Sequence, residues 1–121
     1  LERFPQLRVG FLEANCSWLP HWLWRMDEHQ EKPNAINRLP KKPSEYFLRQ
    51  CFVSVEPDEE LAKYYTDYFG DDNLVFSTDY PHFDSAYPHA VDTFLTLPIT
   101  QESKRKILWD NCHRLYGMSP S

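Results

Sequence analysis

An aspartate, a histidine and a second aspartate lie close together in the segment VFSTDYPHFDS, residues 75–85. The segment opens with apolar residues typical of a buried strand, and Asp79, His82 and Asp84 follow at short spacing. Carboxylates and an imidazole are the groups that transfer protons at neutral pH and that bind divalent metals. The segment therefore predicts chemistry at the point where a strand ends.

Three strand–helix units are predicted along the chain. The strand candidates are Leu7–Leu12, Cys51–Val55 and Leu74–Ser77. A helix is predicted after each strand from the spacing of apolar residues. The first follows a candidate N-cap at Ser17 and has an apolar face that includes Trp18, Trp22 and Met26, and the second runs from Pro57 to a stop at Gly70 with Tyr64, Tyr65 and Tyr68 on one face. The third strand is followed by helices near Ala90–Leu97 and Thr100–Tyr116. The polar, proline-rich stretch Asp27–Pro43 predicts a surface excursion, and Ser44–Gln50 a short helix.

Repeated strand–helix units predict the α/β class, with a parallel sheet and helices packed on it. Open doubly wound sheets and (β/α)8 barrels both meet this description, although three units complete neither. An isolated set of three would leave two bare sheet edges and one uncovered face, which favours pairing with another chain.

Each predicted strand runs into an acidic residue: Glu13, Glu56 and Asp79. The carboxyl ends of parallel strands meet at one edge of the sheet, where such folds place ligands and catalysis. An acid at this position can also cap a helix, and for Glu56, directly before Pro57, we favour that structural role. Both readings stay open for Glu13. Asp79 precedes Tyr80-Pro81, a pair that disfavours helix, so we favour a functional role for it.

The remaining polar residues of the segment are assigned lesser roles. A local metal site built from Asp79, His82, Asp84 and His89 is conceivable, but a proline-rich loop offers little of the fixed geometry that such a site needs. We therefore expect His82 and Asp84 at the lip of a substrate pocket and His89 at a helix start. The tryptophans at helical spacing predict core or a subunit interface.

Composition excludes several classes of protein. The chain has 121 residues, enough for one domain, and a formal net charge of -5 without a basic cluster, so we expect no nucleic-acid partner. The uncharged run Ala14–Trp24 is too short to cross a membrane. Three cysteines without a CxxC pair favour reduced thiols, and hence a cytoplasmic location. A small-molecule substrate is the expected partner.

Three segments resemble the C-terminal third of the amidohydrolase superfamily, in the branch that contains aminocarboxymuconate-semialdehyde decarboxylase. They are ERFPQLRVGFLEANCSWLPHWLWRMDEH, NLVFSTDYPHFDS and ILWDNCHRLYG, in the family's order and spacing. The resemblance implies that residues 1–121 are the C-terminal part of a single barrel domain and form the last three βα units of a (β/α)8 TIM-type barrel.

The same resemblance implies a divalent metal, with zinc the expected ion. Asp79 would be the strand-eight aspartate that binds the metal or acts as general base toward the attacking water. Glu13 lies at the end of strand six, where some members have a histidine that contacts substrate. The chain has no H-x-H pair, so the remaining metal ligands are expected outside it.

The function expected from the resemblance is hydrolysis of a C–N or C–O bond, or non-oxidative decarboxylation, of a small organic substrate. Asp79 is the catalytic residue in this reading, with Glu13, His82 and Asp84 in the substrate pocket. The 121-residue chain alone is expected to be inactive and to need the N-terminal part of the barrel, or other copies of itself. The alternative is a non-catalytic truncated barrel that serves as an oligomerisation module through the face with Trp18 and Trp22.

Overall fold

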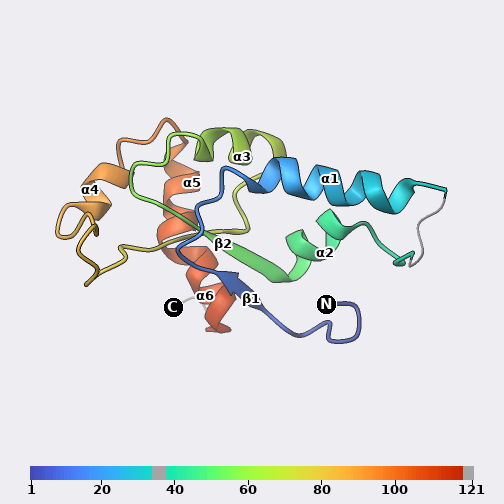
Figure 1. The fold of residues 1–121 in the computed structure, drawn as a ribbon. Coiled ribbons are helices and arrows are strands. Elements are labelled where there is room, and N and C mark those ends of the chain that lie inside the picture. Colours follow the sequence, from blue (N-terminus) through green and yellow to red (C-terminus); the bar gives the residue numbers. More distant parts are fainter. Residues whose placement is uncertain (34–37, 119–121) are drawn as a thin grey trace.

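A parallel sheet forms the centre of the computed structural model, which describes residues 1–33 and 38–118. Within these residues the sheet has the strand order β1-β2-β3 (Figure 1). The strands are β1 (Val9–Phe11), β2 (Cys51–Val55) and β3 (Leu74–Phe76). Val53 in the central strand pairs with Phe11 on one side and Leu74 on the other. β2 is buried along its whole length, as its apolar run CFVSV predicts.

Helices follow each strand. Their bounds are α1 (Leu19–Glu31), α2 (Pro43–Gln50), α3 (Ala62–Phe69), α4 (Ala90–Phe94), α5 (Gln101–Arg105), the π-helical segment η1 (Lys106–Asp110) and α6 (Asn111–Tyr116). The last three continue one another and form the red column that passes the strands in Figure 1. No helix in the described ranges has the length and apolarity that a bilayer span needs.

Different helices cover the two faces of the sheet. On one face Phe11 stacks on Phe47 of α2 and Phe76 packs against Phe94 of α4, with ring centroids 6.1 and 4.9 Å apart. On the other face the Arg114 guanidinium of α6 lies over the Phe52 ring at 5.5 Å. Phe52 is only 3% exposed, so the expectation of an uncovered face is wrong for the central strand.

The first helix differs from its prediction at both ends. Its N-cap is Trp18, because the Ser17 hydroxyl bonds a distant carboxylate instead of the helix. Its C-terminal end, Glu31, lies inside the stretch expected to be a surface excursion. Leu19 and Leu23 face the core, whereas Trp22 is 53% exposed, so the buried face is narrower than the spacing suggests.

The helix predicted directly after Pro57 begins later. α3 starts at Ala62 with Leu61 as its N-cap, and residues 57–61 form turns. Its end at Gly70 is confirmed, where φ of +81° suits a residue without a Cβ atom. Tyr65 is fully buried while Tyr68 is 69% exposed, so the tyrosines do not share one buried face.

Two buried asparagines fasten the amino-terminal ends of the strands. Asn73 Nδ2 donates to the carbonyls of Leu48 and Cys51 at 2.9 and 2.6 Å. Asn111 Nδ2 donates to the carbonyls of Asp71 and Leu74, both at 2.7 Å. These side chains satisfy backbone groups at the turns that enter the sheet and fix that end of it.

Replacing Asn111 with alanine should lower the free energy of unfolding by about 2 kcal/mol or more, because two carbonyls lose their donor. Urea denaturation followed by circular dichroism measures the change. Lys63→Ala serves as the control, since its ion pair with Asp67 is exposed and contributes well under about 1 kcal/mol. Equal losses in the two variants would contradict the assigned role of Asn111.

Candidate metal and substrate site

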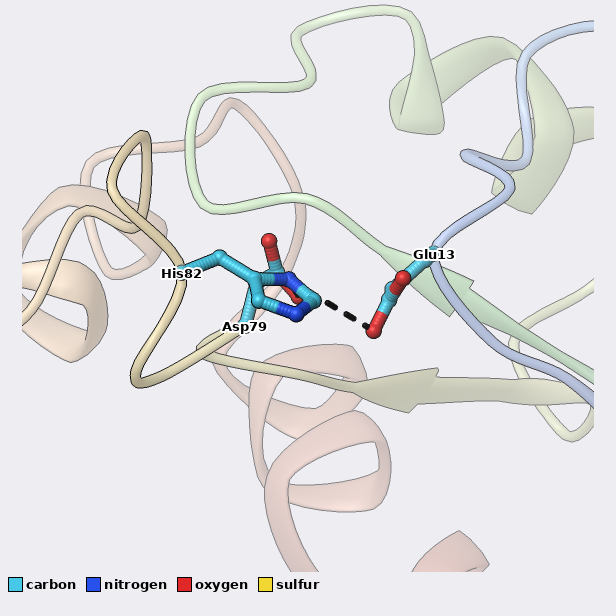
Figure 2. A group of neighbouring side chains, drawn as sticks. All are labelled: Glu13, Asp79 and His82. Carbon is cyan, nitrogen blue, oxygen red and sulfur yellow. Dashed lines mark hydrogen bonds and ion pairs between the residues drawn. The ribbon is translucent and has the colours of Figure 1, made fainter.

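Glu13, Asp79 and His82 come together beyond the carboxyl ends of β1 and β3 (Figure 2). His82 Nδ1 lies 2.8 Å from Asp79 Oδ1 and 4.0 Å from Glu13 Oε1. One potential ligand atom from each residue lies within 4.8 Å of the other two. Residues more than sixty positions apart in the sequence are thus joined because parallel strands end at the same edge of the sheet.

The backbone at this edge adopts an uncommon conformation. Glu13 and Asp79 have φ angles of +55° and +56°, and Asn15 has +53°. Residues with a Cβ atom rarely occupy this left-handed region, and each costs about 1 kcal/mol or more. Such strain persists where surrounding contacts fix it and is concentrated at functional sites. Both carboxylates that face His82 are therefore carried on strained turns at strand ends.

Hydrogen bonds hold the loop after β3 in place. The Asp79 carbonyl accepts from the His82 N–H at 3.0 Å, and the Ser85 hydroxyl donates to the Thr78 carbonyl at 2.7 Å. The Asp79 side chain is 20% exposed and that of His82 57% exposed. Asp79 is thus more deeply buried than the histidine.

The cluster lines an open cleft of about 860 Å³, which is of the size that holds a small organic molecule. Half of its polar lining residues are acidic, namely Glu13, Glu56, Asp58, Asp79 and Asp84, and the others are Asn15, Thr78, His82, Ser85 and Thr93. All three strand-end acids therefore reach one cleft, which is the arrangement predicted from their positions after parallel strands.

The cleft carries an excess of negative charge. Burial raises the pKa of the Glu56 carboxyl, and the neighbouring charges of Asp79 and Glu59 raise it further. No arginine or lysine lines the described part of the cleft. Several carboxylates facing one space repel one another and any anionic ligand unless a cation lies among them.

The donor set fits a divalent metal. Two carboxylate oxygens and an imidazole nitrogen are ligands that manganese and zinc accept. Three protein donors are fewer than a complete shell, so the other ligands would be water, substrate or protein groups outside the described residues. The negative charge of the cleft supplies the electrostatic attraction that such an ion needs.

The predicted site residues fall into two groups. Glu13, Asp79 and His82 form the cluster, whereas Asp84 lines the same cleft outside it. His89 is the N-cap of α4, as expected, and its side chain lies 3.8 Å from that of Asp92. Among the described residues the four-residue nest of Asp79, His82, Asp84 and His89 does not form.

The structure corrects the role predicted for Glu56 and adds Glu59 to the residues that shape the site. Glu56 does not cap a helix, because α3 begins only at Ala62, and its side chain lines the cleft. Glu59 was not singled out, yet it is 8% exposed and bonds the loop that carries Glu13. Its position among acids at a predicted helix start gave no sign of this, because its partners are more than forty residues away.

Comparison with known proteins shows the family to which the chain belongs. Residues 1–118 match the model of a family described as amidohydrolase. The chain belongs to the amidohydrolase family. A gamma-resorcylate decarboxylase from Polaromonas sp. (strain JS666) is 25% identical over 123 residues, which cover 98% of this chain and 36% of that relative.

Solved structures of amidohydrolase-type decarboxylases share the fold. The 5-carboxyvanillate decarboxylase of Sphingomonas paucimobilis superposes with a TM-score of 0.79 and 26% identity, over 98% of this chain and 36% of that one. Dihydroxybenzoic acid decarboxylase from Polaromonas sp. JS666, solved with bound manganese and 2-nitroresorcinol, superposes with a TM-score of 0.77 and 22% identity, over 99% of this chain and 36% of that one. The chain thus spans little more than a third of these relatives. The prediction of the last three βα units of a (β/α)8 barrel is confirmed.

Asp79→Asn should lower the pKa of Glu56 toward that of an ordinary glutamate, because it removes a like charge that faces the same cleft. The shift should be partial, since burial is the larger cause. Carbon-detected NMR titration of the side-chain carboxyls measures it. Asp72→Asn, at the opposite end of β3, should leave the Glu56 titration unchanged, and equal shifts in both variants would refute the coupling.

Proposed function

We propose that the chain forms the C-terminal part of the active site of a metal-dependent, non-oxidative decarboxylase that acts on a small organic acid. The observation that carries this proposal is the cluster of Glu13, Asp79 and His82 at the carboxyl edge of a parallel sheet. Relatives named for gamma-resorcylate, 5-carboxyvanillate and dihydroxybenzoic acid support decarboxylation, and they favour a hydroxylated aromatic acid as the substrate.

Glu13, Asp79 and His82 would hold the divalent cation. When bound, the cation supplies positive charge that attracts a substrate carboxylate into a cleft lined by acids. Manganese is the metal named for one related structure, so it is the first ion to test. Zinc, which the sequence resemblance implies, stays a prediction.

The side chains of this site can handle the proton that the reaction consumes. Decarboxylation replaces a C–CO₂⁻ bond with a C–H bond, so one proton must reach the substrate carbon for each CO₂ that leaves. A proton shared between His82 Nδ1 and Asp79 Oδ1, 2.8 Å apart, lies at the cleft surface where a substrate would sit. His82 is the outer member of this pair, since its side chain is 57% exposed and that of Asp79 is 20% exposed.

Hydrolysis is the second candidate reaction, since the matching family model is described as amidohydrolase. In that case Asp79 would accept a proton from the attacking water, and His82 would orient the carboxylate through the same hydrogen bond. The two reactions separate experimentally, because only decarboxylation releases CO₂.

Asp79→Asn in the protein with a complete barrel should reduce turnover at least a hundredfold, because an amide neither accepts the proton nor binds the metal as a carboxylate does. Release of CO₂ from a panel of hydroxybenzoic acids measures the rate. Near-normal turnover in Asp79→Asn would exclude the assigned role of Asp79. Normal turnover in Asp72→Asn, which makes the same change at the opposite end of β3, is the expected control.

The full chain should bind Mn²⁺ at this cluster, and Asp79→Asn should weaken binding at least tenfold. Electron paramagnetic resonance of free Mn²⁺ gives the affinity directly. Asp84→Asn should change it less than twofold, because Asp84 is not among the three clustered ligands. Equal losses in the two variants would show diffuse attraction by the acidic cleft in place of a defined site.

A further inference from the structure

The Glu59 carboxylate connects the two loops that carry Glu13 and Glu56. Its Oε1 accepts from the backbone N–H groups of Cys16 and Ser17, both at 2.8 Å, and also from the Ser17 hydroxyl. Its Oε2 accepts from the Glu56 N–H at 3.2 Å. One buried side chain thus connects the loop after β1 to the loop after β2, and these loops carry Glu13 and Glu56 of the cleft lining.

Glu59 is held as an acceptor of hydrogen bonds and not as a member of an ion pair. Among the described residues no lysine, arginine or histidine lies within ion-pair distance of it, although it is only 8% exposed. A buried carboxylate without a cationic partner is costly unless several donors satisfy it, and four donors do so here.

These contacts do not serve as an ordinary helix cap. α1 begins at Leu19 with Trp18 as its N-cap, so Cys16 and Ser17 lie before the helix. A capping side chain bonds the free N–H groups of the first helical turn, whereas Glu59 bonds those of the preceding turn. The conformation that Glu59 fixes is therefore that of the loop between Glu13 and α1.

This loop is strained at two positions. Glu13 and Asn15 both have left-handed φ angles, and the Cys16 N–H that Glu59 accepts follows Asn15 immediately. A non-glycine residue keeps such a conformation only where neighbouring contacts hold it. Without Glu59 the loop can relax, and Glu13, whose side chain is 58% exposed, has little else to keep it near His82.

We propose that Glu59 is a positioning residue that holds the loop after β1 so that the Glu13 carboxylate faces Asp79 and His82. It touches neither substrate nor metal and acts through the backbone of Cys16 and Ser17. The proposal rests on the proposed function only in assuming that the cluster binds a cation.

A double-mutant cycle on Mn²⁺ affinity in the full chain tests this role. Glu59→Gln keeps the size of the side chain and one oxygen acceptor but loses the second oxygen and the charge. It should weaken Mn²⁺ binding at least fivefold in the native background and less than twofold when Glu13→Gln is already present. The same loss in both backgrounds would overturn the proposal, because Glu59 would then act on the fold as a whole.

Asp71→Asn provides the matched control, since it makes the same acid-to-amide change at the opposite end of the sheet. Asp71 also accepts bonds from two side chains, Ser103 and Lys106, at 2.7 and 2.8 Å. Asp71→Asn should lower the free energy of unfolding but change the Mn²⁺ affinity less than twofold. An effect as large as that of Glu59→Gln would show that loss of stability alone weakens the site, and would also overturn the proposal.

A measurement without metal separates this proposal from the proposed function. In the metal-free chain, nuclear Overhauser contacts between the Glu13 side chain and the His82 ring should be present in the native protein and in Asp71→Asn, and absent in Glu59→Gln. Their persistence in Glu59→Gln would refute the positioning role whether or not the cluster binds Mn²⁺. If the contacts behave as expected but native protein binds no Mn²⁺, the cation assignment fails and the role of Glu59 stands.

Discussion

The shared direction of three strands is the constraint on which the site depends. Because β1, β2 and β3 are parallel, the residues that follow them reach the same edge of the sheet, although they are far apart in sequence. The acids at this edge repel one another, and the chain keeps them together through backbone turns in which Glu13 and Asp79 take left-handed conformations. The fold thus keeps several carboxylates close together despite their mutual repulsion and the backbone strain.

Stability and chemistry are separated along the strands. At the amino-terminal edge, Asn73 and Asn111 satisfy backbone carbonyls, and Lys106 pairs with Asp71 at 2.8 Å. Each of these side chains has a hydrogen-bonding partner within the protein. At the carboxyl edge, Glu13, Asp79 and His82 leave ligand atoms facing a cleft. Barrel enzymes divide their two ends in the same way, which lets the chemical end change while the structural end stays fixed.

Local signals in the sequence were sufficient for the strands and for the place of Asp79 beyond the end of one of them. The apolar run Cys51–Val55 predicted a strand, and Tyr80-Pro81 made a helix cap at Asp79 a poor explanation. The wrong prediction of a helix cap at Glu56 has a cause in the tertiary structure. Glu59, three residues later, accepts hydrogen bonds from Cys16 and Ser17, and α3 begins only after Glu59. No periodicity in the sequence reports an interaction between residues 42 or 43 positions apart. The exposure of Trp22 was likewise beyond reach, because helical spacing defines a face but not how much of it is covered.

The charge of the cleft decides which kinds of ligand the site can accept. Glu13, Glu56, Asp58, Asp79 and Asp84 face a space in which the described lining offers one imidazole and no lysine or arginine. An organic acid entering alone would meet repulsion from these carboxylates. Under the proposed function, a divalent cation held by Glu13, Asp79 and His82 would supply positive charge beside the substrate. The acidic lining would therefore suit an acidic substrate as part of the proposed metal site, and Glu59, through its bonds to Cys16 and Ser17, would keep the Glu13 side of that site in place.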